Sequence, residues 1–258
     1  MTGIAIGLIL PFAGTILGSV TVFLLKDNLA PGTQKALNGF ASGVMIAASI
    51  WSLLIPSMEM TADFFLPWLP AAAGFLIGIF FLLFLDKVIP HFHAAASRAE
   101  GPNADFKKAT MLFLAVTIHN IPEGMAVGAV FAGLIAEQGS IPFVGALILS
   151  LGIAIQNFPE GAIVSAPMRQ FGFSKFKAFL FGTASGVVEP VAALLTILLT
   201  AVLVPVIPVL LAFAAGAMMY VVIEDLIPDS QQGPHSDAGT ISAACGFVLM
   251  MVLDVAFG

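Results

Sequence analysis

Eight apolar segments, each long enough to cross a lipid bilayer, follow one another along this chain of 258 residues. A helix needs about 20 residues to cross the hydrocarbon core. Hydrocarbon offers no partner for a bare backbone polar group, so such segments cross as helices. The sequence therefore predicts an all-α fold, a polytopic membrane bundle of eight transmembrane helices that forms one transmembrane domain over residues 1–258. The predicted spans are residues 3–25, 36–58, 67–89, 108–134, 142–168, 176–201, 203–227 and 239–257.

Composition agrees with a membrane protein and excludes several other classes. Hydrophobic residues make up 59% of the chain, charged residues 9%, and the mean hydropathy is +1.06. The first apolar run has no basic start and no small-residue cleavage pattern, so we expect a true span rather than a signal peptide. A single cysteine, Cys245, excludes an intrachain disulfide and a thiolate metal cluster. The net charge of -6 argues against a nucleic-acid partner.

The basic residues predict the orientation in the membrane. All nine Lys and Arg residues fall in the first, third and fifth predicted loops or at the helix ends beside them. Loops rich in Lys and Arg stay in the cytoplasm. With eight spans, both termini are then expected outside. We expect a multi-pass protein of the cell inner (plasma) membrane.

The fourth and fifth predicted spans carry the same polar phrase. HNIPEG covers residues 119–124 and QNFPEG covers residues 156–161, each near the middle of its span. Consecutive spans run in opposite directions, so the two copies are antiparallel. This arrangement is typical of transporters that build a central binding site from inverted repeats.

Side-chain spacing on these two spans indicates shared helix faces. His119 and Glu123 are four residues apart, as are Gln156 and Glu160, and residues at this spacing are neighbours on one face. Pro122 lies within the first phrase, and Pro159 within the second. Each proline removes a backbone donor, which predicts a kink and a freed carbonyl four residues earlier.

Two further features extend this polar set. Asn120 directly follows His119, and Asn157 directly follows Gln156, so each asparagine lies next to one of the two shared faces. Glu189 precedes Pro190 near the middle of the sixth predicted span, which predicts a third kink and a freed carbonyl on Gly186. Three glutamates are therefore expected at one depth in the membrane.

Three carboxylates at mid-membrane depth require compensation. Each costs about 2.5–3.5 kcal/mol on insertion scales, so together they cost roughly 8–10 kcal/mol. No Lys or Arg is expected at that depth, which leaves protonation, a water-filled cavity or bound cations. Imidazole nitrogen combined with carboxylate and amide oxygens is a suitable ligand set for a divalent metal. A metal is the favoured occupant.

Acidic residues and histidines also gather near the two predicted mouths of the bundle. They could form an entrance or exit for cations, or be solvated helix ends. Glu224 and Asp225 favour the first interpretation, because they precede Pro228 in the last turns of an apolar helix. The outer set is Glu59, Asp63 and Asp254, and the inner set is Asp86, His91, His93, Glu224, Asp225 and Asp229.

The polar strings resemble those of a known family. HNIPEGMAVG, QNFPEGAIVSAPMR, GTASGVVEPVAALL and GAMMYVVIEDLIPD are similar to the fourth to seventh helices of the ZIP (Zrt/Irt-like) divalent-metal transporters, specifically their bacterial GufA-like branch. The resemblance also covers GFASGVMIAAS and FLDKVIPHFH. It implies eight helices with both termini outside, and uptake of divalent cations into the cytoplasm by alternating access. It also implies a central core of the second, fourth, fifth and seventh spans that slides against the other four.

The resemblance further implies a binuclear metal site, with Glu160 shared between two ions. Many members carry histidine at the position of Gln156, and some carry aspartate at that of Asn157, so the selectivity among zinc, cadmium, iron and manganese stays open, with zinc favoured. The metal would be the transported substrate, and no cofactor is implied. The first ion would be held by His119, Glu123, Gln156 and Glu160, and the second by Asn120, Asn157, Glu160 and Glu189.

Rival functions leave different signatures. An intramembrane metal-dependent hydrolase would show three protein ligands, an open position and a general base, and the HExxH pattern of many zinc proteases is absent from the sequence. We therefore assign no catalytic residue and expect no enzyme. A proton-coupled carrier of a small organic solute and a non-transporting sensor stay open as alternatives. The expected partners are divalent metal ions and the lipid bilayer; the sequence leaves open whether the protein is a homodimer.

Overall fold

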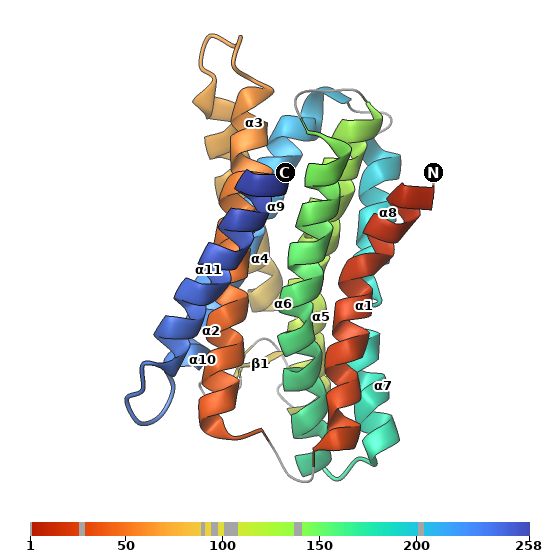
Figure 1. The fold of residues 1–258 in the computed structure, drawn as a ribbon, viewed down its shortest axis with the longest axis vertical. Helices are drawn as coiled ribbons and strands as arrows, with labels where there is room; N and C mark the ends of the chain where they lie inside the picture. Colours follow the sequence, from red (N-terminus) through yellow and green to blue (C-terminus); the bar gives the residue numbers. More distant parts are fainter. Residues whose placement is uncertain are drawn as a thin grey trace.

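The computed structural model describes residues 2–25, 29–88, 91–93, 98–100, 108–136, 141–200 and 204–258. Eight helices in these ranges are long and apolar enough to cross a membrane, which confirms the all-α prediction (Figure 1). The first four spans are α1 (Thr2–Leu24), α2 (Pro31–Ala48) continued by η1 (Ser49–Leu54) and α3 (Ile55–Glu59), α4 (Trp68–Val88), and α5 (Lys108–Ile135). The fifth span is α6 (Phe143–Gln170), and the sixth consists of α7 (Lys175–Ser185) and α8 (Val188–Thr200). The seventh consists of η2 (Val204–Val206), α9 (Ile207–Val221), η3 (Val222–Leu226) and α10 (Ile227–Gln231). The eighth is α11 (Ala238–Phe257).

Helix ends differ from the predicted ones by a few residues. The second span begins at Pro31, ahead of its apolar run, because proline is well suited to the first turn of a helix. Between α4 and α5 lies one addition, an antiparallel pair of three-residue strands, β1 (His91–His93) and β2 (Arg98–Glu100). The side chains of both strands lie outside the described part of the structure, and so do the predicted roles of His91 and His93.

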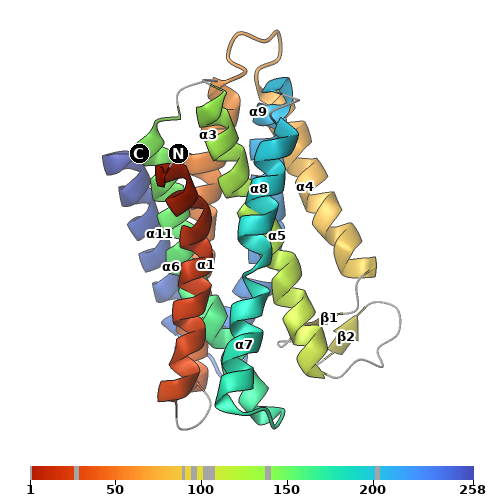
Figure 2. The same ribbon diagram turned by 90° about the vertical axis from the view of Figure 1, so that its right-hand side faces the viewer.

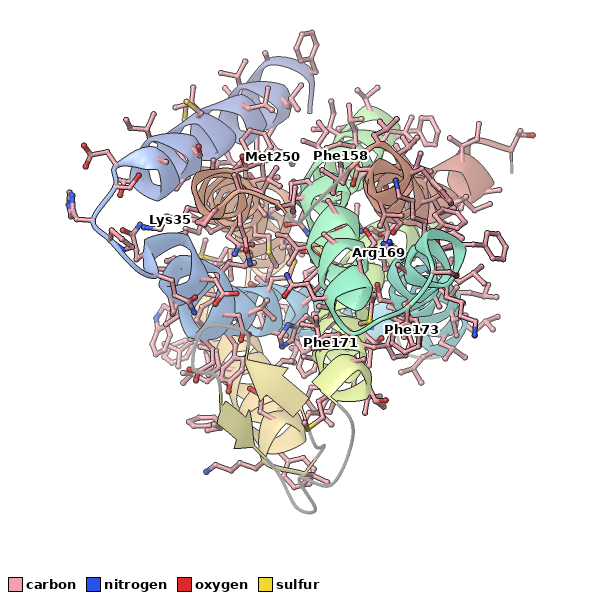
Figure 3. The ribbon with its side chains drawn as sticks, turned by 90° about the horizontal axis from the view of Figure 1, so that it is seen from below. Lys35, Phe158, Arg169, Phe171, Phe173 and Met250 are labelled. Atoms are coloured by element: carbon pink, nitrogen blue, oxygen red, sulfur yellow. The ribbon has the colours of Figure 1, made fainter. Side chains whose placement is uncertain are left out.

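Both chain termini lie at the same end of the bundle, called here the upper end (Figure 1). The view from below shows Lys35 near the start of α2 and Arg169 near the end of α6, and both helices have these termini at the lower end (Figure 3). The basic residues of these two spans are thus at the end opposite the termini.

The second, fourth, fifth and seventh spans form the centre of the bundle, as the family resemblance implies. Between 56% and 78% of their most apolar windows is buried, against 11% to 39% for the other four spans. However, the closest contacts of each central helix are with an outer helix. In these contacts, glycines allow the two backbones to approach within the space that a Cβ atom would occupy.

Glycine contacts of this kind join the eight spans into four pairs. Gly14 and Gly161 join α1 to α6, and Gly43 joins α2 to α11. Gly78 joins α4 to α9, and Gly128 joins α5 to α8. Each central helix is therefore fixed to one outer helix.

The paired helices assemble into two bundles. We call α1, α5, α6, α7 and α8 the site bundle, and α2 to α4, α9 to α11 and their η segments the support bundle. Along the helix axes, α2 and α11 lie on one side of the molecule and α1 and α7 on the other (Figure 3). Where α2 and α9 meet α5 and α6, the interface consists mainly of apolar side chains, including Met45, Ile118, Leu149 and Met218. The grouping differs from the predicted one, in which the central four helices slide together.

Two spans of the support bundle contain a short π-helical segment. These segments are η1 and η3, and a proline follows two residues after each, at Pro56 and Pro228. Each proline lies in the first turn of a new α-helical stretch, where its missing N–H costs little. π segments are often found at functional sites. In this protein they carry Ser52 and Asp225, one toward each end of the bundle.

Candidate metal centre

Helix α5 contributes the first predicted site residues. It continues without a break through Pro122, and it is the most buried of the eight spans. Asn120 and Glu123 have no exposed surface, and His119 is 8% exposed. The four-residue spacing of His119 and Glu123 therefore places imidazole and carboxylate on one buried helix face.

Helix α6 brings the second copy of the phrase against the first. Gln156 and Asn157 are fully buried, and Glu160 is 8% exposed. The Gln156 amide donates hydrogen bonds to Glu123 Oε1, at 2.5 Å, and to Asn157 Oδ1, at 3.1 Å. The carboxyl groups of Glu123 and Glu160 lie close enough to interact. The two phrases thus meet at the centre of the site bundle.

The sixth span is interrupted, where the sequence predicts only a kink. Helix α7 ends at Ser185 and α8 begins at Val188 (Figure 2). A helix end exposes carbonyls that need donors, and Asn120 Nδ2 donates to the Ser185 carbonyl at 3.1 Å. Glu189 lies in the first turn of α8, where the helix dipole favours a negative charge. The break thus places the third carboxylate beside the two phrases.

Helix α1 supports this side of the centre, a role that the sequence interpretation missed. Thr15 Oγ1 donates to Glu189 Oε1 at 3.1 Å, and both residues are buried. The Asn157 amide donates to the Pro11 carbonyl at 3.4 Å. The available signal was a polar residue following a glycine, Gly14–Thr15, within an apolar run. That pattern also fits ordinary helix packing, so it does not by itself indicate a site.

The centre contains more acceptors than donors. Five buried oxygens have no hydrogen-bond partner among the described residues, and no Lys or Arg occurs at positions 109–168 or 178–258. Buried polar atoms are normally satisfied, so each exception calls for an explanation. A divalent cation fits this set, because it needs oxygen donors and negative charge. The five atoms are Glu123 Oε2, Glu160 Oε2, Glu189 Oε2, Gln156 Oε1 and Asn120 Oδ1.

Carboxylates and imidazole alone do not complete an ion site in this conformation. In the parts of the chain that the structure describes, no three His, Cys, Asp or Glu side chains are grouped so that they could hold an ion. The amide oxygens of Gln156 and Asn120 lie among the carboxylates and are the additional donors at hand. An ion bound here would therefore draw on amide as well as carboxylate oxygens.

Below the centre, a cavity of about 60 Å³ lies between the two bundles. His119 and Glu160 line it from the site bundle, and Asn38, Asp225 and Asp229 line it from the support bundle. Its volume can hold a few water molecules. Asn38 was missed by the sequence interpretation. Glu224, the neighbour of Asp225, is exposed and does not line this cavity.

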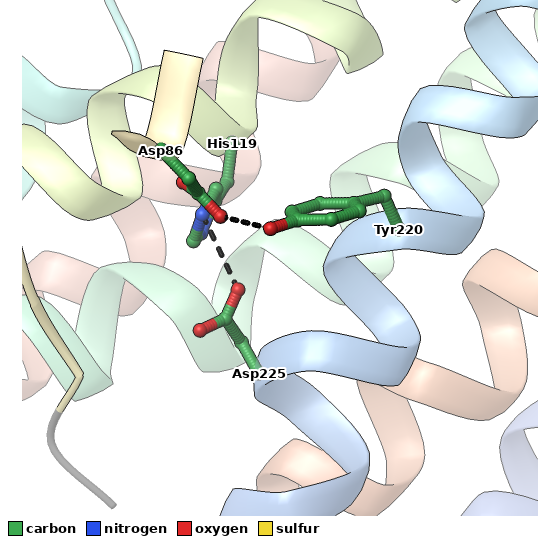
Figure 4. Close-up of polar contacts among 4 residues, drawn as sticks. All are labelled: Asp86, His119, Tyr220 and Asp225. Atoms are coloured by element: carbon green, nitrogen blue, oxygen red, sulfur yellow. Dashed lines mark hydrogen bonds and ion pairs between the residues drawn. The ribbon is translucent and has the colours of Figure 1, made fainter. Parts of the chain in front are cut away.

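Four polar residues meet near this cavity (Figure 4). His119 Nε2 lies 3.3 Å from Asp225 Oδ2, and Tyr220 donates a hydrogen bond of 2.5 Å to Asp86 Oδ2. Tyr220 is a further residue that the sequence interpretation missed. Asp86 and Asp225, predicted near an inner mouth, are thus brought close to His119 of the centre.

A separate pocket of about 270 Å³ lies toward the upper end. Glu59 and Asp254 line it, and Ser52 donates a hydrogen bond of 2.7 Å to Asp254. Asp63 does not line this pocket and is exposed after α3. None of the seven predicted metal ligands lines it.

These features together define a polytopic membrane protein with a buried, oxygen-rich polar centre between two helix bundles. The family description "ZIP Zinc transporter" matches residues 97–254. Over 95% of its length the chain is 34% identical to zinc transporter ZIP11 of Bos taurus, of which the match covers 94%. It is 36% identical to zinc transporter GufA of Myxococcus xanthus (95% of this chain, 96% of the relative) and 36% identical to zinc transporter ZIPB of Bordetella bronchiseptica (96% and 79%).

The chain belongs to the ZIP family, as its polar motifs predicted. These three relatives are named as zinc transporters, and transport is not an enzymatic activity. The family therefore favours transport over the hydrolase that the sequence left as an alternative.

Proposed function

We propose that this protein carries divalent cations, zinc first among them, across the cell inner membrane into the cytoplasm. The observation that carries the proposal is the set of five buried oxygens without a hydrogen-bond partner among the described residues, around three carboxylates, with no Lys or Arg at positions 109–168 or 178–258. An uncompensated charge at this depth is costly. Bound cations would supply the compensating positive charge and would coordinate these oxygens.

The proposed site holds two ions. His119, Glu123, Gln156 and Glu160 would bind the first, and Glu160 would bridge to the second. Asn120, Asn157 and Glu189 would complete the second position. The interactions of Glu160 with both Glu123 and Glu189 support this division, because they place Glu160 within reach of the other two carboxylates.

The proposed orientation places the upper end outside and the lower end in the cytoplasm, as the positive-inside pattern predicts. In this conformation the lower cavity reaches His119 and Glu160, whereas the upper pocket is lined by none of the proposed ligands. Both observations support an inward-facing state. Glu59 and Asp254 would then attract cations to the outer mouth.

The two bundles supply a mechanism for alternating access. All seven proposed ligands belong to the site bundle, which the glycine contacts hold together. Apolar side chains form most of the interface with the support bundle, so displacement there breaks few hydrogen bonds. Sliding of the site bundle would carry the ions from one side to the other without dismantling their ligands.

Zinc uptake into liposomes that contain a zinc-sensitive dye tests the proposal. The native protein should fill the vesicles, and Glu160→Gln and His119→Ala should reduce the uptake rate at least tenfold. Glu224→Gln is the control for loss of a carboxylate, because Glu224 lies on η3, is exposed and does not line the lower cavity. Native protein that binds zinc stoichiometrically but never moves it would refute the proposed transport.

A further inference from the structure

Side-chain hydrogen bonds hold each bundle together internally. In the site bundle, Thr15 bonds to Glu189, and Lys175 Nζ donates to the carbonyls of Phe23 and Leu25 at the end of α1. In the support bundle, Tyr220 bonds to Asp86, Ser52 to Asp254, Ser57 to the Pro208 carbonyl, and Lys35 to the Pro234 carbonyl. These bonds move with their own bundle when the two slide past each other.

The contact between His119 and Asp225 is different, because it crosses from one bundle to the other. His119 belongs to α5 of the site bundle, and Asp225 belongs to η3 of the support bundle. Their side chains are 10% and 14% exposed, and the atoms in contact lie 3.3 Å apart. A polar contact that is shielded from water to this degree is stronger than one at the surface. Sliding of the bundles has to break it.

His119 is also a proposed metal ligand. A ring nitrogen that carries a proton facing Asp225 cannot at the same time give its lone pair to a cation. A cation held through Nε2 therefore displaces the Asp225 contact. His119 Nε2 can therefore either bind the cation or contact Asp225 of the support bundle, but it cannot do both.

We propose that Asp225 is a positioning residue that latches the empty site bundle to the support bundle through His119, and that cargo binding at His119 releases this latch. The inference rests on the proposed function. It links occupancy to movement: the empty protein is held in the present conformation, and loading removes the contact between His119 and Asp225. The π-helical turn of η3 holds Asp225 toward the cavity, while its neighbour Glu224 is exposed.

Distance measurements between spin labels on the two bundles test the latch. Cys245→Ala removes the native cysteine, and labels are placed at Gln170→Cys on α6 and His235→Cys after α10, which are both exposed. Without metal, the native background should give one dominant distance, and zinc should populate a second. Asp225→Asn should raise the metal-free population of the second distance about tenfold, because it removes the charge that holds His119.

Two further variants make the test specific. Asp229→Asn is the matched control: it removes a carboxylate from the same cavity, one helical turn away, and leaves His119 and Asp225 in place. His119→Leu removes the contact from the other side, and its metal-free distances should resemble those of Asp225→Asn. The double variant should then show no further shift, since both single changes delete the same contact.

The outcomes separate the latch from the proposed function. Metal-free distances of Asp225→Asn that match those of the native background overturn the latch, even if zinc uptake is confirmed. Loss of one bound zinc ion in Asp225→Asn, measured by equilibrium dialysis, also overturns it, because Asp225 would then be a ligand itself. A native protein that neither takes up zinc nor changes its distances with zinc overturns the proposed function.

Discussion

Substitution of Thr15 by valine tests whether α1 prepares Glu189 for a cation. Valine keeps the volume of threonine and removes the hydroxyl that donates to Glu189 Oε1 at 3.1 Å. Both residues are at most 1% exposed, so water cannot replace the lost donor. A hydrogen bond to a charged group contributes about 1.5–3 kcal/mol, and each 1.4 kcal/mol is about a tenfold change in affinity. The zinc affinity of the position that uses Glu189 should therefore fall roughly 10- to 100-fold.

Zinc titration against a competing chelator, with purified protein in detergent, measures this change. Thr15→Ser keeps a hydroxyl and should bind zinc nearly as the native protein does. Thr200→Val is the matched control, because Thr200 is buried and its hydroxyl bonds only within α8, to the carbonyls of Thr196 and Ile197. Native affinity at every zinc position in Thr15→Val would refute the argument that this hydrogen bond orients the carboxylate.

Three other changes test the packing and the outer pocket. Gly161→Val places a side chain against the α1 backbone and should destabilise the fold by roughly 1–3 kcal/mol. The thermal unfolding midpoint should therefore fall. Gly32 lies in open space, so Gly32→Val should leave the midpoint near the native value. Lys175→Met removes the donor to the last carbonyls of α1 and should speed amide exchange there about tenfold, whereas unchanged exchange would mean that this cap is dispensable. Ser52→Ala removes the hydroxyl that donates to Asp254 and should raise the KM for zinc uptake about three- to tenfold with little change in kcat. A change in kcat alone would contradict a role of Asp254 in attracting zinc to the outer pocket.

The sequence was sufficient for the helices and for most of the central residues. Apolar runs of membrane length have few alternatives to spanning helices, and the polar phrases on α5 and α6 could be aligned by the four-residue period of a helix. Glu189 was placed at the same depth from its position before Pro190. These three inferences use local spacing only, so they did not depend on knowing which helices touch.

Contacts between distant spans were harder to predict. The density of glycine indicated close packing, but not that Gly43 would meet α11 while Gly161 would meet α1. The grouping into a site bundle and a support bundle was missed for this reason. Thr15 and Tyr220 were missed as well, because an isolated hydroxyl in an apolar helix has many ordinary uses. Their roles depend on side chains from spans more than 100 residues away.

The membership of the two bundles has a consequence for how the protein is made. Neither bundle is a continuous stretch of chain, because α1 belongs with α5 to α8, and α2 and α4 belong with α9 and α11. During synthesis, α1 enters the membrane before α6 has been translated, and α2 enters before α11, against which Gly39 and Gly43 pack. The glycine faces of α1 and α2 are therefore in the membrane before the helices that cover them have been made, and each bundle closes only when segments far apart in the sequence have both been inserted.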